Sequence, residues 1–121
     1  MKSARDFDVY LEDMLHAAEK ACEFTRGMDL SAFLSNDEKI FAVTRALEII
    51  GEAAKHVPES VQKEYPDIPW RAIAGTRDKL IHAYFDVHVQ HLWTTVEQDL
   101  PPLKTGLKRI LRDLRNKGSR E

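Results

Sequence analysis

The stretch IFAVTRALEIIGEAAKHV, residues 40–57, decides the fold class of this chain. Its apolar residues recur at steps of three and four, the period of an α-helix. They form two adjacent stripes, one of Ile40, Val43, Leu47, Ile50, Ala54 and Val57 and one of Ala42, Ala46, Ile49 and Ala53. So wide an apolar face predicts a helix buried on two sides. Its alanines and Gly51 favour close approach of a neighbouring backbone, from the same chain or from a second copy.

The segments on either side of this helix repeat the same period. Further helices are expected over residues 7–25, 59–64, 77–85, 89–96 and 103–114, with one apolar turn at residues 70–74. No segment alternates like a strand. Pro101 and Pro102 are expected to break or kink the helical pattern. The sequence therefore predicts a single all-α domain over residues 1–115, a bundle of about five helices, and then a basic, flexible tail over residues 116–121.

Composition narrows the classes of function. The 121 residues carry a net charge of −2, which argues against a protein that coats nucleic acid by charge alone. Residues 104–121 have a net charge of +5, and the remainder has −7. The single Cys22 predicts a buried thiol in a reducing compartment. No apolar run approaches the ~18 residues that span a bilayer, and the N-terminus lacks an apolar signal core, so we expect a cytoplasmic protein without a membrane contact.

A second stretch, RDKLIHAY at residues 77–84, contains the residues suited to chemistry. Histidine can exchange protons near neutral pH, and arginine presents a charged planar fork to a phosphate. Cleavage of RNA without a metal ion needs a base for the ribose 2′-OH and a cation for the charge on phosphorus. His82 and Arg77 can supply the two, and Asp78, four residues before His82, can hydrogen-bond its ring.

Helix geometry complicates this site. Residues five apart are about 140° apart around an ideal helix, so Arg77 and His82 do not share a face. Two arrangements remain open. Either Arg77 lies in the first turn and swings round, or two chains pack their motif helices together in a homodimer.

The spacing Arg-x4-His-x-Tyr resembles HEPN domains, in particular the small HepT-type toxins that are paired with a nucleotidyltransferase antitoxin of the MntA type. Residues 45–55, 65–70 and 99–104 also resemble that family, in the family's order. The resemblance implies an up-down HEPN helical bundle, a homodimer with a composite site at its interface, and metal-independent endoribonuclease activity through Arg77 and His82. It implies no cofactor.

The same resemblance assigns a regulatory role to Tyr84. In HepT-like proteins the tyrosine of this motif receives AMP from the partner nucleotidyltransferase, which silences the toxin of a type VII toxin–antitoxin system. Family members usually have a polar residue, often asparagine, after the arginine, whereas this chain has Asp78. That carboxylate would orient His82 and favour its imidazolium form, but it would also repel a phosphate.

The sequence leaves other interpretations open. A non-catalytic helical partner that regulates a nucleotidyltransferase is the alternative function. His88 and His91 are three residues apart, but with no third ligand we expect no metal site. Trp70 and Trp93 are expected to pack in the core or an interface rather than stack on bases. The basic residues from Lys104 onward are most simply a solvated helix face, with contact to RNA or to the antitoxin as the alternative.

Overall fold

The computed structural model describes residues 7–75 and 88–119, and within these ranges the chain is helical with no strand. The elements are α1 (Asp8–Phe24), α2 (Leu30–Leu34), α3 (Asp37–Ala54), α4 (Glu59–Glu64), α6 (His88–Thr94), the π-helical turn η1 (Thr95–Asp99) and α7 (Leu100–Ser119). Residues 70–75 are also helical. The all-α prediction is confirmed.

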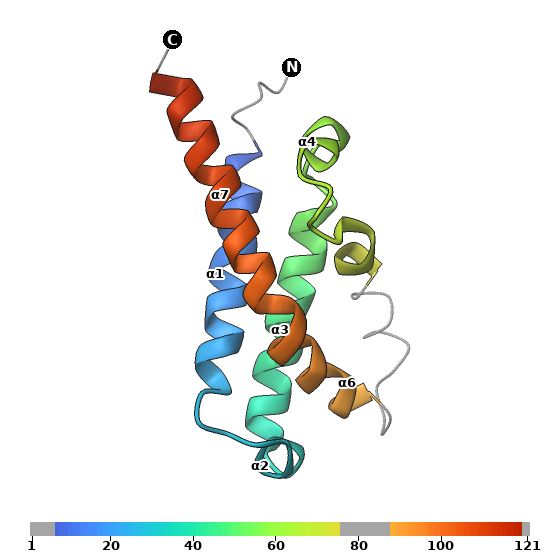
Figure 1. Ribbon diagram of the computed structural model, residues 1–121. Coiled ribbons are helices and arrows are strands. Elements are labelled where there is room, and N and C mark those ends of the chain that lie inside the picture. Colours follow the sequence, from blue (N-terminus) through green and yellow to red (C-terminus); the bar gives the residue numbers. More distant parts are fainter. Residues whose placement is uncertain (1–6, 76–87, 120–121) are drawn as a thin grey trace.

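The three long helices form the body of the bundle. In Figure 1, α1 runs downward, while α3 and α7 run upward beside it. The turn between α1 and α2 contains Gly27 with φ +78°, a left-handed conformation that glycine adopts without strain. Asp29 and Asn36 then cap α2 and α3 by accepting hydrogen bonds from the backbone N–H groups of Ala32 (2.8 Å) and Lys39 (3.1 Å).

The core lies where α1, α3 and α7 meet. Its members are apolar side chains at helical spacing on all three helices, among them Leu11, Met14, Ala18, Val43, Leu47, Ile50, Leu103, Leu107 and Ile110. Helix α3 packs most extensively against α1, and it also contacts α2 and α6. The predicted burial of α3 on two sides is therefore provided within one chain. On its outer face Phe41 is 64% exposed.

The proline pair does not end the helix, so the expectation of a break was wrong. The chain stays helical from His88 to Ser119, and Pro101 and Pro102 lie in the first turn of α7, where missing amide donors are tolerated. The turn before them is π-helical, with the Leu100 N–H donating to the Thr95 carbonyl five residues earlier. This wider turn is the adjustment through which α6 joins α7.

Three smaller expectations can be compared with the structure. Cys22 is half-buried rather than fully buried. Helix α7 runs to Ser119, so helical structure extends into the residues 116–121 that we expected to form a tail. Within the two described ranges, no helix combines the length and apolar character needed to cross a membrane.

The packing of α7 predicts a difference between two leucines. Leu107 is 0% exposed and Leu34 is 46% exposed. Leu107→Ala should lower the free energy of unfolding by about 2–5 kcal/mol because it opens a cavity in the core. Leu34→Ala should lower it by less than about 1 kcal/mol. Urea unfolding followed by circular dichroism measures both, and equal losses would contradict this placement of the core.

Candidate functional site

The four residues predicted to form the site lie outside the described residues. Arg77, Asp78, His82 and Tyr84 all belong to residues 76–87, so their roles stay predictions. The structure does describe the chain on both sides of this segment. Residues 65–75 lead into it, and α6 follows it (Figure 1). How these two flanks are held determines what supports the predicted site.

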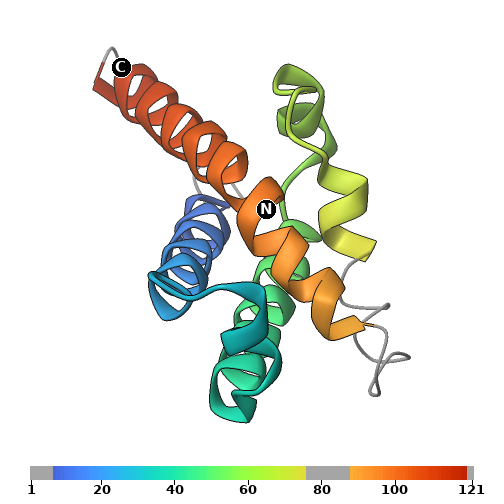
Figure 2. The same cartoon turned by 60° about the horizontal axis from the view of Figure 1, so that its bottom comes forward.

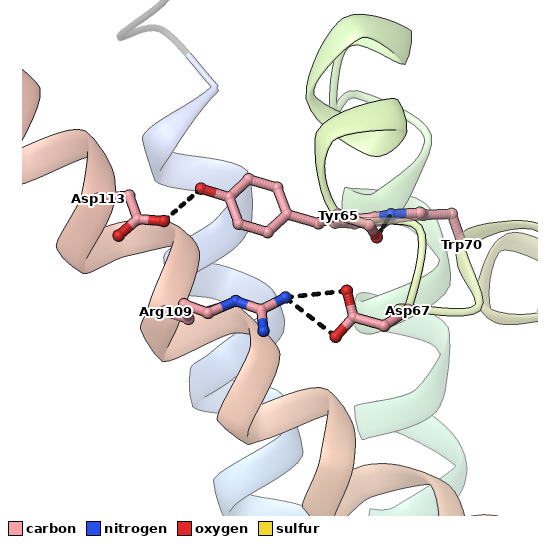
Figure 3. A network of polar contacts seen from close by, with 5 residues as sticks. All are labelled: Tyr65, Asp67, Trp70, Arg109 and Asp113. Atoms are coloured by element: carbon pink, nitrogen blue, oxygen red, sulfur yellow. Dashed lines mark hydrogen bonds and ion pairs between the residues drawn. The ribbon is translucent and has the colours of Figure 1, made fainter.

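The leading flank is bound to α7 by a group of polar contacts, here called the Tyr65 network (Figure 3). The Tyr65 hydroxyl donates to Asp113 Oδ2 at 2.6 Å. Trp70 Nε1 donates to the Tyr65 carbonyl at 3.1 Å, which closes the turn between them. Arg109 Nη2 donates to both carboxylate oxygens of Asp67 at 2.9 Å. Because Arg109 and Asp113 are four residues apart on α7, one face of that helix makes both long-range contacts.

Arg109 has two partners in this network. Its guanidinium carbon lies 5.2 Å from the centroid of the Tyr65 ring, a cation–π contact, while its Nη2 holds Asp67. The Tyr65 ring is thus fixed at its face by a cation and at its hydroxyl by a carboxylate. Such a ring has little freedom to move away from α7.

Burial and the neighbouring carboxylate change the acidity of Tyr65. Burial contributes most, followed by the hydrogen bond and the charge of Asp113, and together they raise the pKa of Tyr65 from 10.0 to about 12. The phenol therefore stays protonated and keeps donating to Asp113 well above neutral pH.

Apolar packing reinforces the same contact. Ile68 is 3% exposed and Trp70 is 7% exposed. Ile68 packs directly on Gly106 of α7, where an added Cβ would lie only 2.8 Å from Ile68 Cδ1. Glycine at this position lets the two backbones approach closely. The helix of residues 70–75 begins at Trp70, so this docking fixes where the chain enters the predicted motif.

The trailing flank, α6, is held by contacts with α2. Trp93 of α6 packs against Phe33 of α2 with ring centroids 5.4 Å apart, and Leu92 is buried. Figure 2 shows α6 and α7 following one another as one helical run. A small crevice is lined from both flanks, by Pro69, Ala72 and Ile73 before the motif and by Thr95 and Asp99 after it. The chain thus enters and leaves the motif segment on the same side of α3.

A larger groove lies elsewhere, between α1 and α3, with a volume of about 270 Å³. Tyr10 and His56 stack across it with centroids 4.4 Å apart and ring planes at 14°. Tyr10 and His56 lie far apart in the sequence, so this pairing was missed. Its charged lining is Asp13, Arg45, Glu48 and Glu52, with His56 beside them. Carboxylates outnumber cations there, which disfavours a phosphate ligand.

The described residues offer no metal site of three or more histidine, cysteine or acidic side chains. His91 is exposed on α6, whereas the side chain of His88 lies outside the described set. Trp70 is a core residue and Trp93 is half-buried against Phe33, which agrees with the expectation of packing roles.

Comparison with known proteins gives consistent matches. A family model described as "Ribonuclease HepT-like" matches residues 14–110. A Thermococcus cleftensis protein named "Probable ribonuclease HepT" is 50% identical over 101 residues, covering 84% of this chain and 92% of the relative. A "Putative RNase" from Methanocaldococcus jannaschii is 40% identical over 113 residues, covering 93% and 97%. Another, from Caldanaerobacter subterraneus subsp. tengcongensis, is 39% identical over 102 residues, covering 84% and 91%. No solved structure matches the chain.

The raised pKa of Tyr65 predicts a specific loss of stability at high pH. A phenol whose pKa is higher in the folded state stabilises that state fully below the unfolded pKa of 10.0 and loses this contribution as pH rises to about 12. Tyr65→Phe should lower the free energy of unfolding by about 1 kcal/mol at neutral pH. The difference between the two proteins should then shrink between pH 10 and 12.

Urea unfolding of the parent and Tyr65→Phe across this pH range measures the effect. Because the two proteins share every other titrating group, their difference isolates the phenol of residue 65. Two curves that stay parallel up to pH 12 would contradict the proposed hydrogen bond.

Proposed function

The chain belongs to the HepT-like ribonuclease family, and on that premise we propose that it is a HepT-type toxin of a type VII toxin–antitoxin system that cleaves RNA without a metal ion. One observation carries the proposal: the matched residues 14–110 include the whole Arg-x4-His-x-Tyr motif from Arg77 to Tyr84. The proposed setting is the cytoplasm, where the RNA substrate and a partner enzyme would both be present.

In the proposed reaction the ribose 2′-OH is the nucleophile. His82 takes its proton, the 2′-oxygen forms a bond to the adjacent phosphorus, and the bond from phosphorus to the 5′-oxygen breaks. The proton on His82 then passes to the leaving 5′-oxygen, which leaves the imidazole neutral again. Arg77 stabilises the negative charge on the phosphorane. A general base contributes roughly 10² to 10⁴ in rate, which suits a slow toxin.

Asp78 is proposed as a supporting residue. Four residues before His82, its carboxylate can accept a hydrogen bond from the ring and favour the imidazolium form. The same charge beside Arg77 weakens attraction for phosphate. An aspartate at this position is therefore expected to lower the efficiency of cleavage. The alternative function is a non-catalytic helical partner that binds and regulates a nucleotidyltransferase.

The homodimer with a composite site is proposed from the geometry of the motif. Arg77 and His82 are about 140° apart on an ideal helix, so groups from two chains would complete one cleft. The wide apolar face of α3 no longer argues for a second copy, because α1, α2 and α6 contact it. Phe41 and Leu34, 64% and 46% exposed, remain as apolar candidates for an interface.

Tyr84 is proposed as the acceptor of AMP from an MntA-like nucleotidyltransferase. It lies seven residues after Arg77, so on a helix the two would project from nearly the same side, about 10 Å apart along the axis. An AMP group on the Tyr84 hydroxyl would place a phosphate beside Arg77 and block RNA from the cleft.

Mixing two inactive variants tests both the catalytic pair and the composite site. Arg77→Ala and His82→Ala should each lower RNA cleavage by at least about 10². Mixed dimers should regain activity, because one of their two clefts contains neither substitution. Arg71→Ala and His91→Ala, which alter exposed residues of the same types in the flanks, are the controls and should cleave like the parent. Chelation by EDTA should have little effect.

Each result has a clear meaning. If Arg77→Ala or His82→Ala cleaves RNA as fast as the parent, the catalytic assignment is wrong. If both are inactive and their mixture stays inactive, each chain contains its own complete site.

Co-expression with the partner enzyme tests the role of Tyr84. The parent should be silenced and should have AMP on the peptide that contains Tyr84, as detected by mass spectrometry. Tyr84→Phe should remain toxic because it has no acceptor hydroxyl. If Tyr84→Phe is still silenced and no AMP is found, the partner acts by occlusion instead.

A further inference from the structure

Helix α7 has its basic side chains on two different faces. Arg109 and Lys117 face the segment that docks on α7, where Arg109 holds Asp67 at 2.9 Å and Lys117 Nζ lies 3.8 Å from a Glu64 carboxylate oxygen. Arg109 and Lys117 therefore form ion pairs within the chain. Lys104, Lys108, Arg112 and Arg115 are not part of that contact.

These four residues form a stripe, here called the α7 stripe. Their spacing of four, four and three residues places them within an arc of about 80° on the helix. Lys108, Arg112 and Arg115 are exposed, and Lys104 is half-buried. The one acidic residue of α7, Asp113, lies on a different face and accepts from Tyr65. Across residues 7–75 and 88–119, no acidic group forms an ion pair with any of the four.

The dimensions of the α7 stripe suit a linear polyanion. The eleven residue steps from Lys104 to Arg115 span about 17 Å along the helix, with about 6 Å between residues four apart. A stacked nucleic acid strand has one phosphate per about 3.4 Å, so the stripe runs along about five phosphates. The remainder of the chain has a net charge of −7 against +5 for residues 104–121, so a polyanion is repelled elsewhere and attracted here.

The surroundings of the α7 stripe favour a nucleic acid backbone over a protein partner. Protein interfaces need an apolar or aromatic centre. The exposed large apolar side chains that the structure describes are Val9, Leu34 and Phe41, on α1, α2 and α3, and none is on α7. The exposed residues of α7 next to the α7 stripe are polar, such as Thr105 and Asn116. Phosphate contacts require only cations placed along the strand.

We propose that the α7 stripe binds the phosphate backbone of the RNA strand, independently of its sequence, and so holds substrate on the enzyme outside the predicted catalytic motif. This inference rests on the proposed ribonuclease function, to which it adds a binding surface for the substrate.

Neutralising the stripe tests the proposal. The stripe variant combines Lys104→Gln, Lys108→Gln, Arg112→Gln and Arg115→Gln. The control variant combines Arg26→Gln, Arg45→Gln, Lys55→Gln and Lys63→Gln, exposed residues away from the stripe. Both change the net charge from −2 to −6. The probe is a fluorescent single-stranded oligouridylate with 2′-O-methyl riboses, which cannot be cleaved through a 2′-OH. Anisotropy gives its Kd at several KCl concentrations, and circular dichroism checks that helicity is kept.

A single strand contributes about 0.7 to the slope of log affinity against log salt per phosphate contact, so loss of four contacts should reduce that slope by about 3. The Kd of the stripe variant at 0.1 M KCl should rise at least about tenfold, while the control should stay within about twofold of the parent. A stripe variant that matches the control in both Kd and slope overturns the proposal. The proposal is also overturned if poly-L-glutamate displaces the probe as effectively as unlabelled RNA does at equal charge. That result would indicate a site for acidic polypeptides.

Cleavage of unmodified RNA separates this inference from the proposed function. If the parent cleaves RNA and the stripe variant binds and cleaves like the control, the function stands and the stripe proposal fails. If the parent binds RNA through the stripe but never cleaves it, the stripe proposal stands and the ribonuclease assignment fails.

Discussion

The docking of residues 65–70 on α7 is the contact on which the predicted site depends. It combines two kinds of interaction of different strength. Burial of Ile68 and Trp70 contributes about 1.5–3 kcal/mol each. The Arg109–Asp67 pair is 42% and 61% exposed at its side chains and therefore contributes less than about 1 kcal/mol. Apolar burial thus supplies most of the stability, and the polar contacts determine the position of the segment along α7. Both act immediately before the chain enters the motif.

Helix α7 has a different role on each of three faces. Leu103, Leu107 and Ile110 face the core, while Gly106, Arg109 and Asp113 receive the docking segment. The α7 stripe faces solvent. Because a helix places residues three and four apart on one face, these sets do not interfere. The same helix can therefore support the fold, hold the flank of the predicted site and offer a surface to substrate.

Much of the fold could be predicted because it depends on local periodicity. The steps of three and four predicted α1 and α3, and Glu59–Glu64 is helical as expected. Pro101 and Pro102 misled the prediction because the π-helical turn Thr95–Asp99 precedes them and places both prolines in the first turn of α7, where a missing amide donor is tolerated. The Tyr65 network was missed because its partners are 42 and 48 residues apart in sequence. Nothing in the local sequence around Tyr65 and Asp67 indicates that both contact the same helix, α7. The proposed catalytic motif, from Arg77 to Tyr84, was predicted from residue types, spacing and the family resemblance, and its geometry lies outside the described residues.

The central claim is that this fold supports cleavage of RNA by its own 2′-OH, without a metal ion. The most direct measurement is the chemistry of the ends produced when the purified parent cleaves RNA in the presence of EDTA. The account predicts 2′,3′-cyclic phosphate and 5′-hydroxyl ends, and no cut at a position that has a 2′-deoxyribose. Products with 5′-phosphate and 3′-hydroxyl ends, formed only when a divalent ion is restored, would contradict it.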